Sequence, residues 1–431
     1  MMEITKLTRE SRDALLENLA GRNAEDTRGQ EEAARVIIAD IRREGDEALF
    51  RYEQKFDRCT LTKETVRVSR EEIDAAYEAL DPAFVEVLRK AAENIRVFHE
   101  KQIRQSWITT SEDGAILGQK ITPVGISGCY VPGGRAAYPS SVLMNVVPAK
   151  VAGVKRIIIT TPPDSEGRVN PGTLVAADIA GADEMYKAGG AQAIAAMAYG
   201  TESIPKVDMI TGPGNIYVAM AKKLCFGAVG IDSVAGPSEI LVIADETADP
   251  RYVAADLLSQ AEHDPMASAI LLTNDRAVAE GVAREIDGFL ETLSRADIIR
   301  ASLEHYGHIF LADTLEELVE AANIIASEHL EIVTKDPFEV MTGITNAGAI
   351  FLGPWSSEPL GDYFAGPNHI LPTGGTARFF SPLGVDTFVK KSSIISYSKK
   401  ALEKVHGDIE LFAEQEGLTA HANSIRVRFE Q

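Results

Sequence analysis

Short apolar runs rich in β-branched residues alternate with helical patterns through most of this 431-residue chain, and this alternation constrains the fold more than any other feature. Strands separated by helices at this spacing are typical of a parallel sheet built from βαβ units. In the first set, the predicted strands are Gln119–Val124, Gly125–Val131, Arg156–Thr161, Glu184–Lys187 and Val207–Thr211, and the predicted helices are 139–152, 172–180, 190–199 and 215–226.

A second set of alternating elements follows with different residues. We therefore predict an α/β protein with two incomplete Rossmann-like parallel-sheet domains. In this second set, the predicted strands are Ser238–Ala244, Ser268–Thr273, His308–Ala312, Glu331–Thr334 and Ala349–Leu352, and the predicted helices are 250–262, 275–304 and 314–327.

The segments that flank these two sets have different patterns. Residues 29–57 and 70–105 carry the charged, 3.6-period pattern of amphipathic helices. Residues 353–378 are rich in Pro and Gly and predict a long loop, a kind of segment that often carries function. A helix at 399–416 and a strand-like run at Ser424–Phe429 offer too little apolar material for a separate core. We therefore expect this tail to pack on another surface, such as a neighbouring subunit.

The charge balance narrows the class of partner. The chain has 43 Lys and Arg against 64 Asp and Glu, a net charge of −21, which opposes a phosphate backbone or an anionic membrane surface. Three scattered cysteines predict reduced thiols. No run approaches the ~18 apolar residues of a membrane span, and the first residues lack a signal peptide's apolar core. We expect a soluble cytoplasmic protein that binds a small molecule, and no nucleic acid or membrane.

Four polar residues form a candidate metal site. Gln260 and His263 stand three apart at the end of a predicted helix, where they would share one face. Asp362 could add a carboxylate oxygen and His421 a second imidazole, a mixed N/O set that suits a divalent ion such as zinc. An amide oxygen is a weak ligand that leaves the ion more positive, which favours a catalytic site. Taken singly, such residues are more often a solvated helix face, a turn or a surface histidine.

A Glu–His pair, Glu328-His329, follows the predicted helix 314–327. A histidine with an unperturbed pKa of about 6.5 suits proton transfer, and a neighbouring carboxylate can position water. Such a pair by itself is more often a feature of a helix end at the surface.

A glycine-rich turn, Gly212-Pro-Gly214-Asn215, opens a predicted helix after an apolar strand. Its backbone N–H groups could hold a phosphate at the helix N-terminus. The third glycine of a dinucleotide fingerprint is absent, so a tight turn explains the pattern equally well.

Several long blocks, in this order and spacing, resemble the histidinol dehydrogenase family over nearly the whole chain. The blocks are Gly128–Gly134, Gly212–Asn215, Ile231–Asp245, Gln260–Asp264, Ser327–Glu331 and Gly361–Thr373. The resemblance implies oxidation of L-histidinol through L-histidinaldehyde to L-histidine, the last step of histidine biosynthesis. It also implies that each turnover consumes two NAD, with one zinc ion per subunit.

The resemblance assigns roles to individual residues. It implies that zinc is bound by Gln260, His263, Asp362 and His421, that Glu328 and His329 are the acid–base pair, and that Tyr130, Gln192 and Asn215 contact NAD. The substrate contacts it implies are Ser238, Gln260, His263, His329, Asp362, Glu416 and His421. His369 lies in the same loop as Asp362 and could support it without a catalytic role.

The resemblance also implies a homodimer in which Glu416 and His421 of one chain complete the partner's active site. The domains expected on this basis are a small helical N-terminal extension (1–27), a catalytic and metal-binding α/β domain (28–128 and 237–378), a Rossmann-like NAD-binding domain (129–236) and a C-terminal tail that packs on the partner (379–431).

Two alternatives stay open at this point. An aldehyde dehydrogenase could work through a thiohemiacetal at Cys129 or Cys225, although Cys225 lies in a predicted apolar helix, which favours packing. A two-domain solute-binding protein would share the α/β architecture, and the lack of an export signal argues against it.

Overall fold

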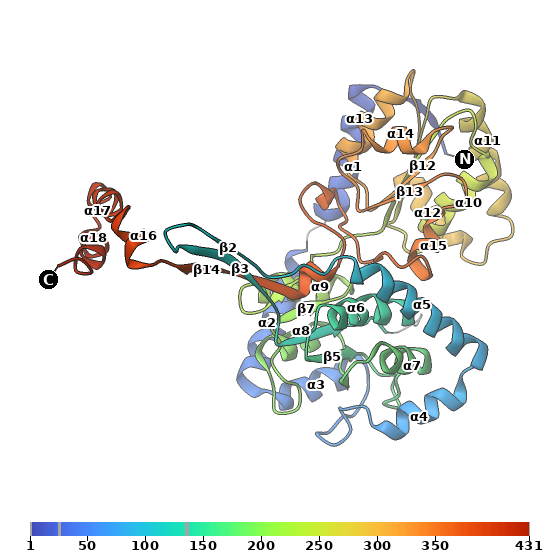
Figure 1. The fold of residues 1–431 in the computed structure, drawn as a ribbon. Coiled ribbons are helices and arrows are strands. Elements are labelled where there is room, and N and C mark those ends of the chain that lie inside the picture. The colour runs from blue at the N-terminus through green and yellow to red at the C-terminus, as the bar shows by residue number, and fades with distance from the viewer. Residues whose placement is uncertain (1, 25–26, 134–137, 431) are drawn as a thin grey trace. The chain divides into compact units, whose positions relative to one another are not determined.

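The computed structural model describes residues 2–24, 27–133 and 138–430, and its chain divides into two compact units (Figure 1). The first unit comprises Met1–Gln102 and Gly125–Phe388, and the second comprises Ile103–Val124 and Val389–Gln431. Within the described ranges, no helix is both long enough and apolar enough to cross a membrane. Gly134, the last residue of the 128–134 block, lies outside the described residues.

The larger sheet of the first unit has six parallel strands. Their order is β1 (Ile4–Lys6), β11 (Gly307–Leu311), β10 (Ser268–Thr273), β9 (Glu239–Ala244), β12 (His329–Val333) and β13 (Ala349–Leu352). Helices α10 (Pro250–Ala261), α11 (Arg276–Phe289) and α12 (Ala296–Tyr306) cover one face, and α1 (Arg9–Ala24) and α13 (Leu315–Ile325) cover the other.

The central strand β9 shows why the apolar runs are continuous rather than alternating. Every residue of β9 is buried, and successive side chains point to opposite faces of a sheet. Ile240 and Val242 belong to the core under α10, α11 and α12, whereas Leu241 and Ile243 belong to the core under α1 and α13. Because helices cover both faces of the sheet, both the odd and the even positions of the strand must be apolar.

The smaller sheet of the first unit has five parallel strands. Their order is β6 (Glu184–Lys187), β5 (Arg156–Thr161), β4 (Ile126–Tyr130), β7 (Met209–Thr211) and β8 (Gly230–Ile231). The strand order reverses between β4 and β7, and sheets of this kind leave a crevice there, at the carboxyl ends of the strands. The associated helices are α6 (Pro139–Val151), α7 (Pro171–Ala180), α8 (Gly190–Tyr199) and α9 (Ile216–Cys225).

Four helices from the N-terminal part of the chain pack around the smaller sheet. Helices α2 (Arg28–Glu44) and α3 (Asp46–Phe56) share a buried cluster with α8 and α9. Helices α4 (Arg70–Ala79) and α5 (Pro82–Glu100) contact α7, and α5 also contacts α6. The amphipathic patterns at 29–57 and 70–105 are therefore explained by packing on this sheet, while β1 and α1 belong to the larger one. The predicted domain borders remain a prediction.

The second unit consists of an antiparallel sheet followed by three short helices. The strand order is β14 (Val389–Ser396), β3 (Ile116–Pro123) and β2 (Trp107–Thr110), and the helices are α16 (Lys399–Glu403), α17 (His406–Gln415) and α18 (Thr419–Arg426). The predicted strand Gln119–Val124 overlaps β3, so it belongs to this sheet and not to a parallel one. The predicted strand Ser424–Phe429 is wrong. Ser424 lies in α18, which packs against α17, and no neighbouring strand pairs with this run in the described residues.

The α/β fold class with two parallel sheets is confirmed, and several local predictions need correction. The predicted helices 275–304 and 399–416 are each divided into two, as α11 with α12 and as α16 with α17. Strand β12 begins at His329, two residues earlier than predicted. Helix α10 ends at Ala261, just short of its predicted end. The expected loop 353–378 contains a short helix, α15 (Glu358–Tyr363), in which Pro359 occupies a first-turn position where its missing N–H costs nothing. The remaining short elements are α14 (Pro337–Met341) and the 3₁₀ turns η1 (Thr376–Arg378) and η2 (Val385–Phe388).

Candidate active site

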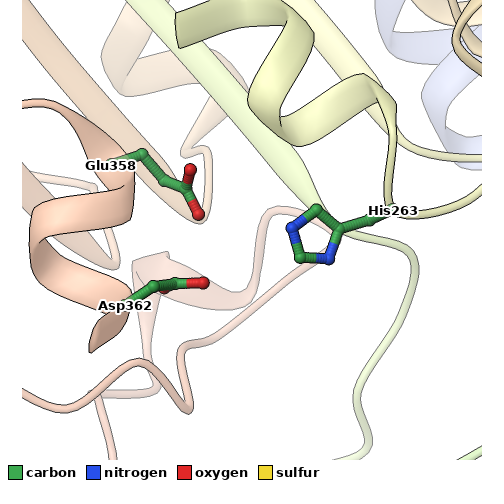
Figure 2. A group of neighbouring side chains, drawn as sticks. All are labelled: His263, Glu358 and Asp362. Carbon is green, nitrogen blue, oxygen red and sulfur yellow. The ribbon is translucent and has the colours of Figure 1, made fainter. Parts of the chain in front are cut away.

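Three side chains from two distant segments converge at one point in the first unit (Figure 2). His263 follows the end of α10, and Glu358 and Asp362 lie about one turn apart on α15. One ligand atom from each residue lies within 4.8 Å of the other two, and Figure 2 shows the carboxylates and the imidazole facing a common space. One imidazole nitrogen and two carboxylate oxygens form a donor set that zinc accepts.

Glu358 is a member of this group that our sequence reasoning missed. The signal is present, because Glu358 and Asp362 are four residues apart around Pro359, the spacing that brings two carboxylates to one face of a helix. The Pro- and Gly-rich composition of residues 353–378 predicts a loop, in which that spacing carries no meaning. The missed helix therefore led directly to the missed ligand candidate.

Gln260, at the same helix end as His263, is an orphaned acceptor. It is 1% exposed, and its Oε1 has no hydrogen-bond donor among the described residues. Such an atom costs about 1–3 kcal/mol unless something satisfies it, and a cation would do so. His263 is exposed and lies beyond the helix, where its N–H donates to the Gln260 carbonyl at 3.1 Å. Helix α10 ends at Ala261, between the two residues, and their convergence on one ion stays a prediction.

Burial and neighbouring charges shift the pKa values of the two carboxyl groups of α15 in opposite directions. Burial, with the nearby Asp362, raises the pKa of Glu358 to about 7. Its Oε2 accepts from Ser259 Oγ at 2.9 Å, and its N–H donates to Glu331 Oε1 at 2.8 Å. Burial opposes ionisation of Asp362 as well, but contacts with His329 and His369 outweigh it and lower the pKa to about 2. One ionised carboxylate thus stands beside one that titrates near neutrality.

The Glu328–His329 pair lies at the amino end of β12, beside the amino end of β9. Both residues are buried, at 7% and 3% exposure. Glu328 Oε2 accepts from the Glu239 N–H at 2.9 Å, and His329 Nδ1 lies 3.0 Å from the Glu239 carbonyl, to which it donates. His329 Nε2 lies 3.8 Å from Asp362 Oδ1 and has no hydrogen-bond partner among the described residues. This buried nitrogen is therefore an unsatisfied polar atom that lies next to Asp362.

The same surroundings raise the pKa of both members of the pair. Burial raises the pKa of Glu328 to about 8, although the adjacent His329 opposes the shift. Burial alone would lower the pKa of His329, but the carboxylates of Glu328 and Asp362 outweigh it and raise the pKa to about 10. Strongly perturbed buried groups of this kind are typical of acid–base sites. His329 lies next to Asp362, one of the metal-ligand candidates, and it is a strand residue rather than part of a helix end; its role in proton transfer stays a prediction.

His369 lies against Asp362, as expected for a supporting neighbour. Its Nδ1 is 3.0 Å from the Asp362 carbonyl oxygen, and its Nε2 is 3.3 Å from Ser141 Oγ on α6. This chain of contacts links the amino edge of the larger sheet to the first turn of α6. Ser141 was not among the residues singled out from the sequence.

The remaining predicted substrate and metal residues are Ser238 in the first unit and Glu416 and His421 in the second. Ser238 stands directly before β9, and its carbonyl accepts from the Ser268 N–H at 3.0 Å. Glu416 follows α17, and His421 lies on α18; both are exposed and belong to the second unit. The described contacts bring Asp362 together with His263, and the part of His421 in the site stays a prediction.

The residues expected to contact a dinucleotide lie at the carboxyl edge of the smaller sheet. Tyr130 ends β4, is 3% exposed, and accepts from the Gly190 N–H at 3.1 Å through its hydroxyl. Gln192 lies in the first turn of α8 and is buried, and its Nε2 donates to Glu53 Oε1 at 2.9 Å. Glu53 also accepts from the Gly189 N–H at 3.0 Å. It thereby caps α8, whose own N-cap residue has no side chain.

The Gly212–Asn215 turn lies at the reversal of strand order. Gly212 has φ of +108°, and a Cβ there would come within 2.1 Å of the Tyr130 carbonyl oxygen, so only glycine fits. Lys222 Nζ donates to the Gly212 carbonyl at 2.9 Å, and the Gly212 N–H donates to Asp232 Oδ2 at 2.8 Å. These two side chains also form a buried ion pair. Asn215 Oδ1 caps α9, which leaves its amide nitrogen for a ligand.

All three cysteines are buried and free. Burial raises the pKa of the Cys129 thiol to about 12 and that of Cys225 to about 11. A thiol nucleophile reacts as its thiolate, and reactive thiols are partly exposed with a lowered pKa. The aldehyde dehydrogenase alternative therefore has no suitable nucleophile in either residue.

Comparison with known proteins agrees with this geometry. The family model for histidinol dehydrogenase matches residues 20–429. A histidinol dehydrogenase of Halalkalibacterium halodurans is 58% identical over 401 residues, which is 93% of this chain and 94% of that protein. The histidinol dehydrogenase of Bacillus subtilis is 55% identical over 402 residues, 93% of this chain and 94% of that protein. A crystal structure of histidinol dehydrogenase from Elizabethkingia anophelis aligns with a TM-score of 0.93 at 38% identity, covering 99% of this chain and 98% of that one.

Proposed function

Because the chain belongs to the histidinol dehydrogenase family, we propose that it oxidises L-histidinol through L-histidinaldehyde to L-histidine, using two NAD and one zinc ion per subunit. The observation that carries the proposal is the convergence of His263, Glu358 and Asp362 next to the buried Glu328–His329 pair. Each of the two oxidations removes one hydride and one proton, and one water enters between them.

The donor set near α10 and α15 fits zinc. The orphaned Gln260 Oε1 and the mixed nitrogen and oxygen donors of His263 and Asp362 would hold the ion, with Glu358 as a further candidate that we add to the predicted set. Bound zinc would supply a Lewis acid that polarises the substrate's oxygen, and bound NAD would supply the hydride acceptor. Asp362 stays ionised in this environment and His263 must be neutral to donate.

Glu328 and His329 move the protons in this proposal. The Glu239 carbonyl holds Nδ1 of His329, which leaves Nε2 as the atom that exchanges a proton with the substrate hydroxyl. Glu328 takes a proton from water during formation and oxidation of the aldehyde hydrate. Its pKa of about 8 allows it to accept and release a proton in a mildly alkaline solution.

The carboxyl edge of the smaller sheet fits a dinucleotide. Gly212 admits close approach to the backbone, and the N-termini of α8 and α9 offer N–H groups to phosphate. Tyr130, Gln192 and Asn215 are the residues proposed to contact NAD there. These features support NAD binding, and Glu53 would hold Gln192 in place.

The direct test is NADH formation by the purified protein with L-histidinol, before and after removal of metal with a chelator. The expected result is two NADH per histidine formed, loss of turnover after chelation, and recovery with zinc. Full activity in exhaustively metal-free protein would refute the role of the metal. No NADH from histidinol in the zinc-loaded protein would refute the proposed reaction.

The proposed enzyme is a homodimer in which Glu416 and His421 complete the partner's site. Large apolar side chains are exposed on the second unit, which supports a contact surface there; examples are Ile108 at 63%, Ile395 at 74% and Phe412 at 69%. In a two-fold dimer such an exchange is reciprocal, so each site would be built from both chains.

Complementation between two inactive variants tests the shared site. Gln260→Ala and His421→Ala proteins, unfolded together and reassembled, would form mixed dimers in which one site carries both lesions and the other carries none. Random mixing makes about half the dimers mixed, so about a quarter of wild-type activity should return. If His421 serves its own chain, every site keeps one lesion and the mixture stays inactive.

A further inference from the structure

A buried arginine on the N-terminal helix α1 is linked to the Glu328–His329 pair through a single residue, Glu239. Arg22 is in the last turn of α1, and its side chain is 0% exposed. Its guanidinium bonds Glu239 Oε1, donates to the Met266 carbonyl at 3.0 Å, and lies 5.4 Å from the centre of the Tyr306 ring. Arg22 Nε has no partner among the described residues. A fully buried charge is costly, so this arrangement needs an explanation beyond packing.

Glu239 connects Arg22 to both members of the catalytic pair. Its N–H donates to Glu328 Oε2 at 2.9 Å, and its carboxylate Oε2 accepts from the Glu328 N–H at 3.4 Å. Its carbonyl accepts from His329 Nδ1 at 3.0 Å. Three polar groups of this one residue therefore contact the pair, and the fourth, carboxylate Oε1, contacts Arg22.

The packing of α1 holds Arg22 firmly. Leu15 and Leu19 of α1 are buried in the core with β9 and β12 residues, including Leu241 and Leu330. The arginine therefore reaches Glu239 from a helix that is itself anchored on the strands that carry Glu239 and His329. A displacement of Glu239 would move the donor to Glu328 and the acceptor of His329 together.

We propose that the Arg22–Glu239 ion pair is a positioning device for Glu328 and His329, which makes the N-terminal helix part of the catalytic apparatus. Arg22 neutralises and orients the Glu239 carboxylate, and Glu239 sets the place of the Glu328 carboxyl group and the tautomer of His329. This inference rests on the proposed function of the pair. Arg22 and Glu239 act through Glu328 and His329, so both are positioning residues.

The test compares Arg22→Met, Glu239→Gln and the double variant by steady-state kinetics with histidinol and with histidinaldehyde. A misplacement of about 1 Å in a catalytic group can lower the rate on the order of a hundredfold, so kcat is expected to fall at least about tenfold in all three. The KM for histidinol and the bound zinc should stay within about twofold of wild type, because the metal-ligand candidates are not displaced. Arg22→Lys, which keeps the charge, should recover part of kcat.

Melting temperature separates positioning from a purely structural role. Arg22→Met leaves a buried Glu239 charge unpaired and should melt well below wild type, whereas the double variant removes both charges and should melt closer to it. Under the proposal, the double variant regains stability but stays slow. If it regains both stability and wild-type kcat, the pair is only structural and the proposal is overturned.

Two controls keep the result interpretable. Arg12→Met changes an arginine on the same helix that pairs with Glu320 at 3.4 Å, and it should leave kcat unchanged. An equal fall of kcat in Arg12→Met would also overturn the proposal, because any disturbance of α1 would then suffice. If Arg22→Met does not fold, Glu239→Gln and the double variant carry the test. Wild-type turnover of histidinol in the same assay shows that the proposed function itself holds.

Discussion

Replacing Glu328 by Gln should slow oxidation of histidinaldehyde more than oxidation of histidinol. The reason is that the aldehyde must be hydrated before its oxidation, and Glu328 is the group proposed to take a proton from that water. Gln retains an oxygen that can accept from the Glu239 N–H, now 2.9 Å from Glu328 Oε2, so the local structure should survive. What is lost is the carboxylate that acts as a base.

The size of the effect follows from the raised pKa of Glu328. With a pKa of about 8, about a tenth of Glu328 is ionised at pH 7 and about nine tenths at pH 9, since one pH unit is a tenfold change in the proton ratio. If ionised Glu328 is the base, the wild-type rate of aldehyde oxidation should rise close to tenfold between pH 7 and pH 9. Removal of a general base typically costs about 10²–10⁴-fold in rate.

The assay is NADH formation from supplied histidinaldehyde and, separately, from histidinol, between pH 6 and 10. The Glu328→Gln variant should lose both the rate and the rise near pH 8 in the aldehyde reaction. In His329→Asn both oxidations should be slow, and any residual rise should move to higher pH, because His329 lowers the pKa of Glu328. The reasoning is wrong if Glu328→Gln oxidises the aldehyde at the wild-type rate while only the alcohol step collapses.

Three further predictions concern the metal, the turn and the thiols. His263→Asn should weaken zinc binding at least about tenfold in a competitive chelator titration, whereas exposed His305→Asn should not. Burial lowers the pKa of His263, so wild-type affinity should fall only at a pH below the usual histidine pKa of about 6.5. Gly212 has φ of +108°, and a Cβ there would lie 2.1 Å from a carbonyl oxygen. Gly212→Ala should therefore lower the free energy of unfolding by about 1–3 kcal/mol or more in thermal unfolding and weaken NADH binding measured by fluorescence. Cys129→Ala and Cys225→Ala should retain turnover; a folded but inactive variant would revive a thiol mechanism.

Much of the fold was predictable because its cause is local. The run from Ile240 to Ala244 is apolar at every position, which marks a strand covered on both faces, and the intervening helices show a 3.6-residue period. The Gly212–Asn215 turn was predictable as a feature before a helix, and Asn215 indeed caps α9. Such signals depend only on residues within a few positions of each other.

The candidate site was predictable only in part. Asp362, His263 and His329 were identified, and the structure brings them within reach of one another. Glu358 was missed because a six-residue helix with an internal glycine and proline has a weak local signal. His99 lies in the amphipathic helix α5 and is fully buried, so its environment depends on what packs on that helix.

The sequence by itself determined that this chain forms two parallel α/β sheets and that it belongs to the histidinol dehydrogenase family. Both could be recognised because hydrophobic periodicity and motif blocks consist of residues that are contiguous in the chain. Only the tertiary structure decided which polar groups meet. Arg22 and Glu239 are 217 positions apart, and their ion pair exists because α1 packs on the strands that carry Glu239 and His329. A long-range contact of that kind depends on how whole elements pack, and no local pattern encodes it.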